Sequence, residues 1–108
     1  METDVSTSWP LKRWGKVWAA EKGYALVCKL PKIDLHYWHV FYKPRAEGSD
    51  WCNFKICAIG QDYGRMNYTL GWNGKRFARS GEEQHMEDNH PLLFSEVCKA
   101  LRCRGYLG

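Results

Sequence analysis

The stretch YWHVFYK at residues 37–43 decides the fold, because it is dense in aromatic and β-branched residues that favour extended backbone. Pro44 follows it directly. A proline cannot donate to a β-ladder, and it pushes the residue before it towards extended geometry. We therefore predict a strand that ends at Lys43. The imidazoles of His36 and His39 are expected to be ordinary half-buried side chains of this strand.

The chain downstream of this strand predicts two more strands. Residues 45–50 form a polar loop, and residues 51–59 then alternate between apolar and polar side chains. The apolar positions share one face: Cys52, Phe54, Ile56 and Ala58. The turn residues QDYG at 61–64 precede a third strand at residues 66–72. The side chains on one face of that strand are Met66, Tyr68, Leu70 and Trp72.

A hairpin is predicted directly after the third strand. Asn73 and Gly74 are the residue types that most readily adopt the two positive φ values of a type I′ turn. The register expected from such a two-residue loop pairs Trp72 with Lys75, Leu70 with Phe77 and Tyr68 with Arg79. Rings and cations would then stack across the two strands.

The N-terminal part of the chain allows two interpretations. Residues 14–30 read as two strands around the turn AEKG at 20–23, with the second strand alternating at Tyr24, Leu26, Cys28 and Leu30. The competing interpretation is a helix that carries Leu11, Trp14 and Trp18 on one side, and Gly15 weakens it. Residues 1–8 are expected to be a mobile tail, and residues 9–108 a single domain.

The C-terminal part predicts one helix. It begins near Pro91, with Asn89 or His90 as its cap, and ends at Gly105. Its apolar stripe at i, i+3, i+4 spacing consists of Leu93, Phe94, Val97, Cys98 and Leu101. The side chains expected to face water are Ser95, Glu96, Lys99 and Arg102. The predicted fold class is therefore α+β: an antiparallel meander of five or six strands with one C-terminal helix packed on one face.

Composition restricts the class of function. The 108 residues contain 6 Trp, 6 Tyr and 4 Phe beside 16 Lys and Arg, with a net charge of +4. The charge is uneven, because residues 80–90 carry four acidic side chains and no basic one. We find no catalytic signature, phosphate loop or cofactor motif, so we expect a binding protein that is not an enzyme and needs no cofactor.

The cysteines and the hydropathy pattern predict a cytoplasmic, soluble protein. Five cysteines cannot all pair within one chain, and residues 1–18 do not resemble a signal peptide. Apolar runs are far shorter than the ~20 residues that a transmembrane helix needs, so we expect no membrane partner. If a phage encodes the chain, the compartment is the cytoplasm of its host.

The sequence argues against three kinds of chemical site. A zinc site from Cys52 and Cys57 would need ligands that converge, yet five positions along a strand put the two on opposite faces. The same spacing on a helix turns Cys103 away from Cys98. A Cys/His nucleophile is conceivable, but no pair is marked as activated. The carboxylates at residues 82–88 share one polar stretch, whereas catalytic carboxylates need differing environments, so we expect this stretch to be a solvated loop or a short helix.

Binding residues are predicted where rings and charges gather. They are Arg13, Trp14, Lys16 and Trp18 near the start, Tyr68, Trp72, Lys75, Arg76 and Arg79 on the hairpin, and Glu82, Glu83, Glu87 and Asp88 in the acidic stretch. Rings beside cations can stack bases and neutralise phosphates, or can anchor a protein interface. Cross-strand cation–π packing is the purely structural alternative.

The segment YTLGWNGKRF at 68–77, followed by a polar stretch and NHPLLFSEV at 89–97, resembles the strand, hairpin and terminal helix of small phage and mobile-element proteins. These include anti-CRISPR and other anti-defence inhibitors. The resemblance implies a non-enzymatic, phage-encoded inhibitor that covers a functional surface of a host defence complex. It assigns no binding residue. The alternative function is a small nucleic-acid-binding module that uses a basic aromatic sheet face.

Overall fold

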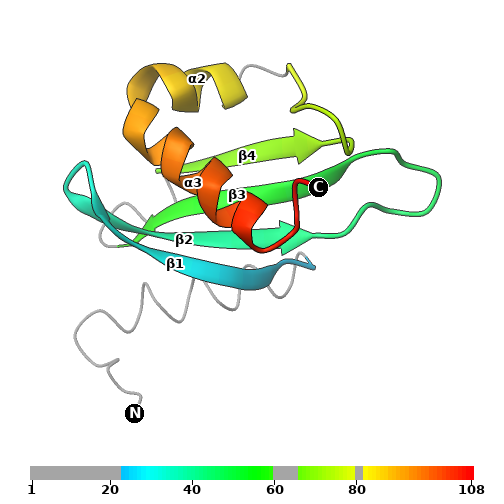
Figure 1. Cartoon of the computed structure of the whole chain (residues 1–108), viewed down its shortest axis with the longest axis horizontal. Helices are drawn as coiled ribbons and strands as arrows, with labels where there is room; N and C mark the ends of the chain where they lie inside the picture. Colours follow the sequence, from blue (N-terminus) through cyan, green and yellow to red (C-terminus); the bar gives the residue numbers. More distant parts are fainter. Residues whose placement is uncertain (1–22, 60–65, 80–81) are drawn as a thin grey trace, which may run out of the picture.

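A computed structural model describes residues 23–59, 66–79 and 82–108. Its strands form one antiparallel sheet in the order β1-β2-β3-β4. Their bounds are Ala25–Ile33 for β1, His36–Lys43 for β2, Cys52–Ile59 for β3 and Asn67–Trp72 for β4. Helices α2 (Glu82–Asn89) and α3 (Pro91–Cys103) lie on the same side of this sheet (Figure 1). The predictions for the tail, for the strand or helix before Gly23 and for the turn at 61–64 lie outside the described residues.

The α+β class and the antiparallel meander are confirmed. Strands β2, β3 and β4 each begin within one residue of the predicted start and end at the predicted residue. The predicted alternation in β3 is confirmed as well, because Phe54, Ile56 and Ala58 belong to the main core, whereas Cys57 belongs to a cluster on the opposite face. Period-two patterning therefore located the central strands.

The expectation of five or six strands is wrong for the described residues, which contain four. After β4 the chain makes only an isolated bridge, Trp72 to Phe77, instead of a fifth strand. The predicted pairing of Trp72 with Lys75 is therefore wrong by two residues. Asn73 is not among the described residues with positive φ, so the turn is not type I′. Its side-chain oxygen accepts instead from the backbone N–H groups of Lys75 and Arg76, both at 2.9 Å, and this favours a longer loop.

The predicted alternation in β1 is also wrong. Register shifts occur between Leu26 and Cys28 and between Leu30 and Ile33. Such bulges insert extra residues and change which face the following side chains occupy. As a result Tyr24 packs against the cluster on the opposite face, while Leu30 belongs to the main core. Leu26 is exposed.

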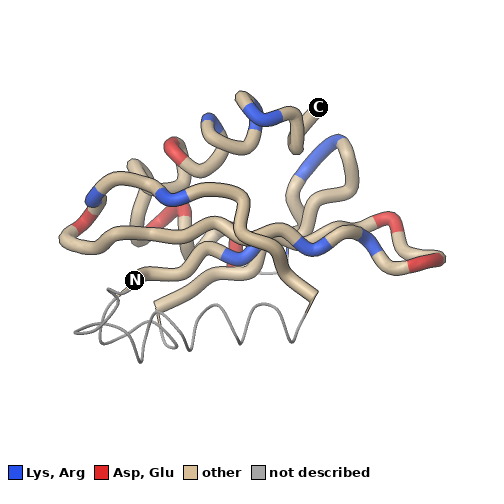
Figure 2. Tube along the Cα trace, turned by 90° about the horizontal axis from the view of Figure 1, so that it is seen from below, with Lys and Arg blue, Asp and Glu red and all other residues tan. Residues whose placement is uncertain are grey.

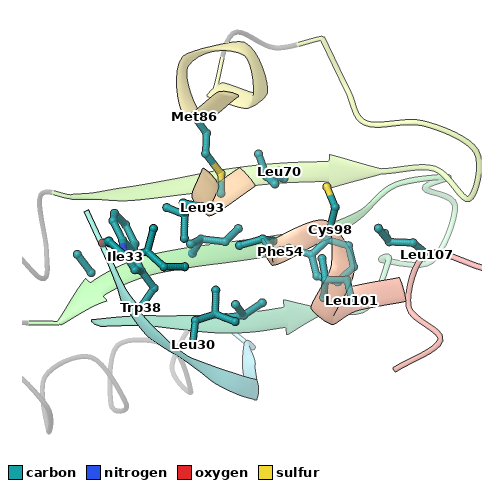
Figure 3. Close-up of a cluster of buried hydrophobic side chains, with 14 residues drawn as sticks. Leu30, Ile33, Trp38, Phe54, Leu70, Met86, Leu93, Cys98, Leu101 and Leu107 are labelled. Carbon is teal, nitrogen blue, oxygen red and sulfur yellow. The ribbon is translucent and has the colours of Figure 1, made fainter. Parts of the chain in front are cut away.

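The expectation of a single helix is wrong, because the acidic stretch folds as α2. Glu82 and Glu83 occupy its first turn, where carboxylates interact favourably with the helix dipole. Met86 is the one buried side chain of α2. Figure 3 shows it pointing towards Leu70 and Leu93, so one methionine fixes this polar helix to the core.

Helix α3 is confirmed as the element that covers the sheet. It begins at Pro91, and His90 occupies the N-cap position without a side-chain capping bond. Its buried stripe is Leu93, Val97, Cys98 and Leu101. Gly105 has φ +82°, and the N–H groups of Gly105 and Tyr106 donate to the carbonyls of Arg102 and Leu101. This is the Schellman arrangement that ends a helix at glycine.

The turn between β1 and β2 contacts the start of α3. Asp34 and Leu35 both have positive φ, 50° and 73°. Aspartate tolerates this region, whereas leucine rarely adopts it. The Asp34 carboxylate lies 2.7 Å from Nδ1 of His90. Trp38 lies beneath this contact: its indole N–H donates to the Ile33 carbonyl at 2.9 Å, and its ring meets His90 edge-on at 5.3 Å. The first hairpin is thus attached to the helix.

Candidate functional site

A groove of about 400 Å³ opens between the loop at residues 73–79 and helix α3. Its lining residues are Trp72, Lys75, Arg76, Phe77, Arg79, Glu83, Phe94, Cys98 and Arg102. In Figure 2 the basic part of the loop lies beside the C-terminal half of α3, which carries basic segments of its own. We name this feature the cationic groove.

Two local features of β4 and the loop build one wall of the cationic groove. The Asn73 side chain holds Lys75 and Arg76 at the tip of the loop through the two bonds described above. The returning chain then lies close to β4, where Ala78 N–H donates to the Gly71 carbonyl at 2.8 Å. A Cβ at Gly71 would stand 3.3 Å from that of Ala78, so glycine permits this close approach.

Helix α3 supplies the other wall through residues four apart. Phe94, Cys98 and Arg102 follow one another at i, i+4 and i+8, and this spacing places them along one side of the helix. Cys98 is buried, Phe94 is half-buried and Arg102 is exposed. The wall therefore changes from apolar at its base to cationic at its rim.

Charge in the cationic groove is strongly one-sided. Four cations line it, Lys75, Arg76, Arg79 and Arg102, against one carboxylate, Glu83. Within the described part of the chain no ion pair or side-chain hydrogen bond engages any of these four cations. Exposed like charges repel one another, so an anion that enters the groove would be attracted by all four.

Three rings form the apolar part of the cationic groove. Trp72 meets Phe77 edge-on, with centroids 4.8 Å apart and planes at 61°. Phe77 meets Phe94 at 6.0 Å and 59°. None of these rings lies flat on its neighbour, and each is half-buried. The groove thus offers aromatic surface next to positive charge.

The structure brings five of the predicted binding residues together: Trp72, Lys75, Arg76, Arg79 and Glu83. It separates the others. Tyr68 lies towards the far end of β4, where its ring meets His90 at 6.0 Å. Glu82 accepts a hydrogen bond from the Thr69 backbone N–H at 2.7 Å, while Glu87 and Asp88 are exposed on α2. The four predicted residues near the start, Arg13, Trp14, Lys16 and Trp18, lie outside the described residues.

Sequence reasoning did not predict four of the lining residues as binding residues. The sequence predicts a pairing of Phe77 with Leu70. It predicts that Phe94 and Cys98 pack in the core under the helix and that Arg102 faces water. The signal that could have found the last three is their spacing of four, which puts an aromatic, a small and a cationic side chain in one row. Nothing local in the sequence reveals that this row faces the loop.

The structure also places one Cys/His pair side by side. His39 and Cys57 are cross-strand partners on the face opposite α3, and each is 2% exposed. Burial raises the pKa of the Cys57 thiol to about 12. Burial likewise raises the pKa of the Cys98 thiol, against a smaller lowering by Arg102. Both shifts oppose thiolate formation, whereas nucleophilic cysteines have lowered pKa values.

The cysteines and potential metal ligands of the described residues do not gather in one place. All five cysteines are free thiols. Cys52 packs against the main core and Cys57 on the other face, so the predicted divergence of these two is confirmed. No three His, Cys, Asp or Glu side chains of the described segments gather as metal ligands. None of the described helices is long and apolar enough to span a bilayer.

No family model, curated protein or solved structure matches this chain. The site therefore has to be interpreted from its own geometry.

Proposed function

We propose that this chain is a non-enzymatic binding protein whose cationic groove receives an anionic segment of another macromolecule. The observation that carries the proposal is the lining itself, to which the described residues contribute four cations, three rings and a single carboxylate. Aromatic side chains and arginine dominate the binding energy of macromolecular interfaces. The groove combines both on one side of the molecule.

The geometry supports a binding role for these cations over a purely structural one. A structural role would pair Arg79 or Arg102 with a carboxylate or place it over a ring, but neither engages a described partner in that way. The surface carboxylates of α2 that could have neutralised the groove, Glu87 and Asp88, do not line it. The positive charge is thus available to a ligand.

The test is a titration of the ¹⁵N-labelled full chain with two anionic polymers, inorganic polyphosphate and poly-L-glutamate. We expect chemical-shift changes at the Trp72 indole N–H and at the backbone of the loop 73–79. The matched internal control is the turn at Asp34 and Leu35, which should not shift. Shifts spread evenly over the surface, or absent with both polymers, would refute the proposal.

A second candidate function is suggested by α2. Its eight residues include no Lys or Arg, and Glu87 and Asp88 are exposed. An acidic helix can compete with phosphate for the basic surface of a nucleic-acid-handling complex. This feature supports the anti-defence proposal, in which the chain is a phage-encoded inhibitor of a CRISPR-Cas type complex.

This second function can be tested by plaque formation on bacteria with an active CRISPR-Cas system. If the chain is such an inhibitor, its expression should restore plaques of a targeted phage, and the double variant Glu87→Gln/Asp88→Asn should lose most of that effect. Arg76→Ser serves as the control, because it changes the groove and leaves α2 intact. Full inhibition by the α2 variant would contradict the role of this helix.

A further inference from the structure

We infer that the anionic segment bound by the cationic groove is a single strand of nucleic acid, with an unpaired base against the groove rings and its phosphates at the rim cations. This inference rests on the function proposed above and names the class of its ligand. Three properties of the groove favour it: the rings, the lone carboxylate and the concave shape.

The rings favour a ligand that is itself planar and aromatic. Trp72, Phe77 and Phe94 contribute apolar ring surface within reach of the cations. Acidic peptides would engage the cations, but aspartate and glutamate side chains leave such ring surface uncovered. A nucleotide offers a flat base and a phosphate in the same unit, and bases stack on aromatic side chains in most proteins that bind single strands.

Glu83 favours a nucleic acid over an acidic peptide for a different reason. Glu83 is half-buried and lines the cationic groove. Its carboxylate repels phosphates and peptide carboxylates alike, so a hydrogen bond from a base is the contact that distinguishes the two ligands. Cytosine and adenine carry exocyclic amino groups whose N–H can donate a hydrogen bond to a carboxylate, whereas thymine and uracil carry none. The single acidic residue thus predicts a preference among bases.

The shape favours a single strand over a duplex. A volume of about 400 Å³ is that of a small ligand pocket and suits one or two nucleotides. Proteins that read a duplex insert a projecting helix or β-ribbon into its major groove, whereas this site is hollow. Bases in a duplex are also stacked on one another, so they could not reach the rings.

The experiment measures fluorescence anisotropy of the full chain with fluorescein-labelled dC10, dT10 and a ten-base-pair duplex at about 150 mM salt. We expect dC10 to bind about fivefold or more tightly than dT10, and the duplex to bind more weakly than dC10. Phe94→Leu keeps apolar volume but removes a ring, and should weaken dC10 binding about fivefold. Glu83→Gln should bring the dC10 to dT10 ratio towards one.

Charge variants provide the matched control. Arg76→Glu and Lys32→Glu change the net charge equally, but Lys32 is exposed on β1 and lies outside the groove. We expect about a tenfold loss for Arg76→Glu and less than twofold for Lys32→Glu. Arg76→Ser should also lower the slope of log affinity against log salt by about one unit.

Each other outcome overturns the inference in a recognisable way. Equal losses for Arg76→Glu and Lys32→Glu, or duplex binding as tight as dC10, would exclude a single-strand site in the groove. Binding of poly-L-glutamate that depends on Arg76, with no binding of either oligonucleotide, would keep the proposed function and refute its nucleic-acid ligand. No binding of any polymer or oligonucleotide would refute both.

Discussion

The two ends of the sheet use their charges differently. At the β1–β2 turn, the Asp34 carboxylate lies against the imidazole of His90, so the two polar groups engage each other. At the opposite end, where β4 finishes at Trp72, four cations line the cationic groove together with one carboxylate, and within the described segments none of the four is paired. We call these the closed end and the open end. The difference separates side chains that hold the fold from side chains available to a ligand.

The largest expected effect compares one tryptophan from each end. Trp38 is fully buried at the closed end, and Trp38→Ala should lower the free energy of unfolding by about 3–5 kcal/mol. Trp72 is half-buried at the open end. Trp72→Ala should lower the free energy of unfolding by about 2 kcal/mol, because folding removes less of its ring surface from water than it does for Trp38. Urea denaturation measures both. Equal losses would remove the distinction between the two ends.

The contact between the first hairpin and α3 should have the next largest effect. His90→Ala removes the partner of Asp34 and the ring contacts with Trp38 and Tyr68. We expect a loss of about 1.5–3 kcal/mol, the range for a hydrogen bond to a charged group. Asp34→Asn is the milder control, because asparagine tolerates positive φ and its amide oxygen still accepts. If thermal unfolding of His90→Ala is unchanged, the closed end is not held by this contact.

Substitutions at two residues with positive φ should change the free energy of unfolding by smaller amounts and in opposite directions. Leu35 has φ +73° and is 84% exposed, so Leu35→Asn should relieve strain and stabilise the protein by about 0.5–1 kcal/mol. Gly74 has φ +96° with no atom within 4 Å of an added Cβ. Gly74→Val should therefore destabilise by about 1 kcal/mol or more through the backbone alone. Chemical denaturation in which both variants change stability in the same direction would contradict this prediction.

The smallest effect is expected from the groove cations themselves. Lys75→Ser and Arg76→Ser remove exposed side chains without described partners, so the free energy of unfolding should change by no more than about 0.5 kcal/mol. Denaturant midpoints would show this directly. A loss near 2 kcal/mol for either variant would mean that the open end is held together by these charges.

Sequence reasoning succeeded where one pattern dominates. The β-rich stretch before Pro44, the alternation in β3 and the i, i+3, i+4 stripe of α3 each reflect a face buried against the core. Sequence reasoning failed where a side-chain hydrogen bond changes the turn type that the residue types predict. Asn73 matches a type I′ turn by residue type, yet its oxygen accepts two loop N–H groups and moves the pairing by two residues.

The candidate site was predicted only in part for a related reason. The cations at Lys75, Arg76 and Arg79 are close in sequence, so their grouping could be read directly. Their meeting with Phe94 and Arg102 depends on how α3 crosses the sheet, and no local pattern records that. For residues 82–88 the sequence leaves a loop and a short helix open, because only Met86 is buried there and its tertiary contact decides between the two.

The hydrogen bonds around β4 also bear on how copies of this chain meet one another. Among the described strands β4 lies at the edge of the sheet, and outward backbone groups of such a strand can pair with a strand of another molecule. Two of them are occupied: the Thr69 N–H by the Glu82 carboxylate, and the Gly71 carbonyl by the Ala78 N–H. At these two positions another strand cannot pair with β4 without displacing a bond that the chain already makes, so strand addition beside the groove is disfavoured.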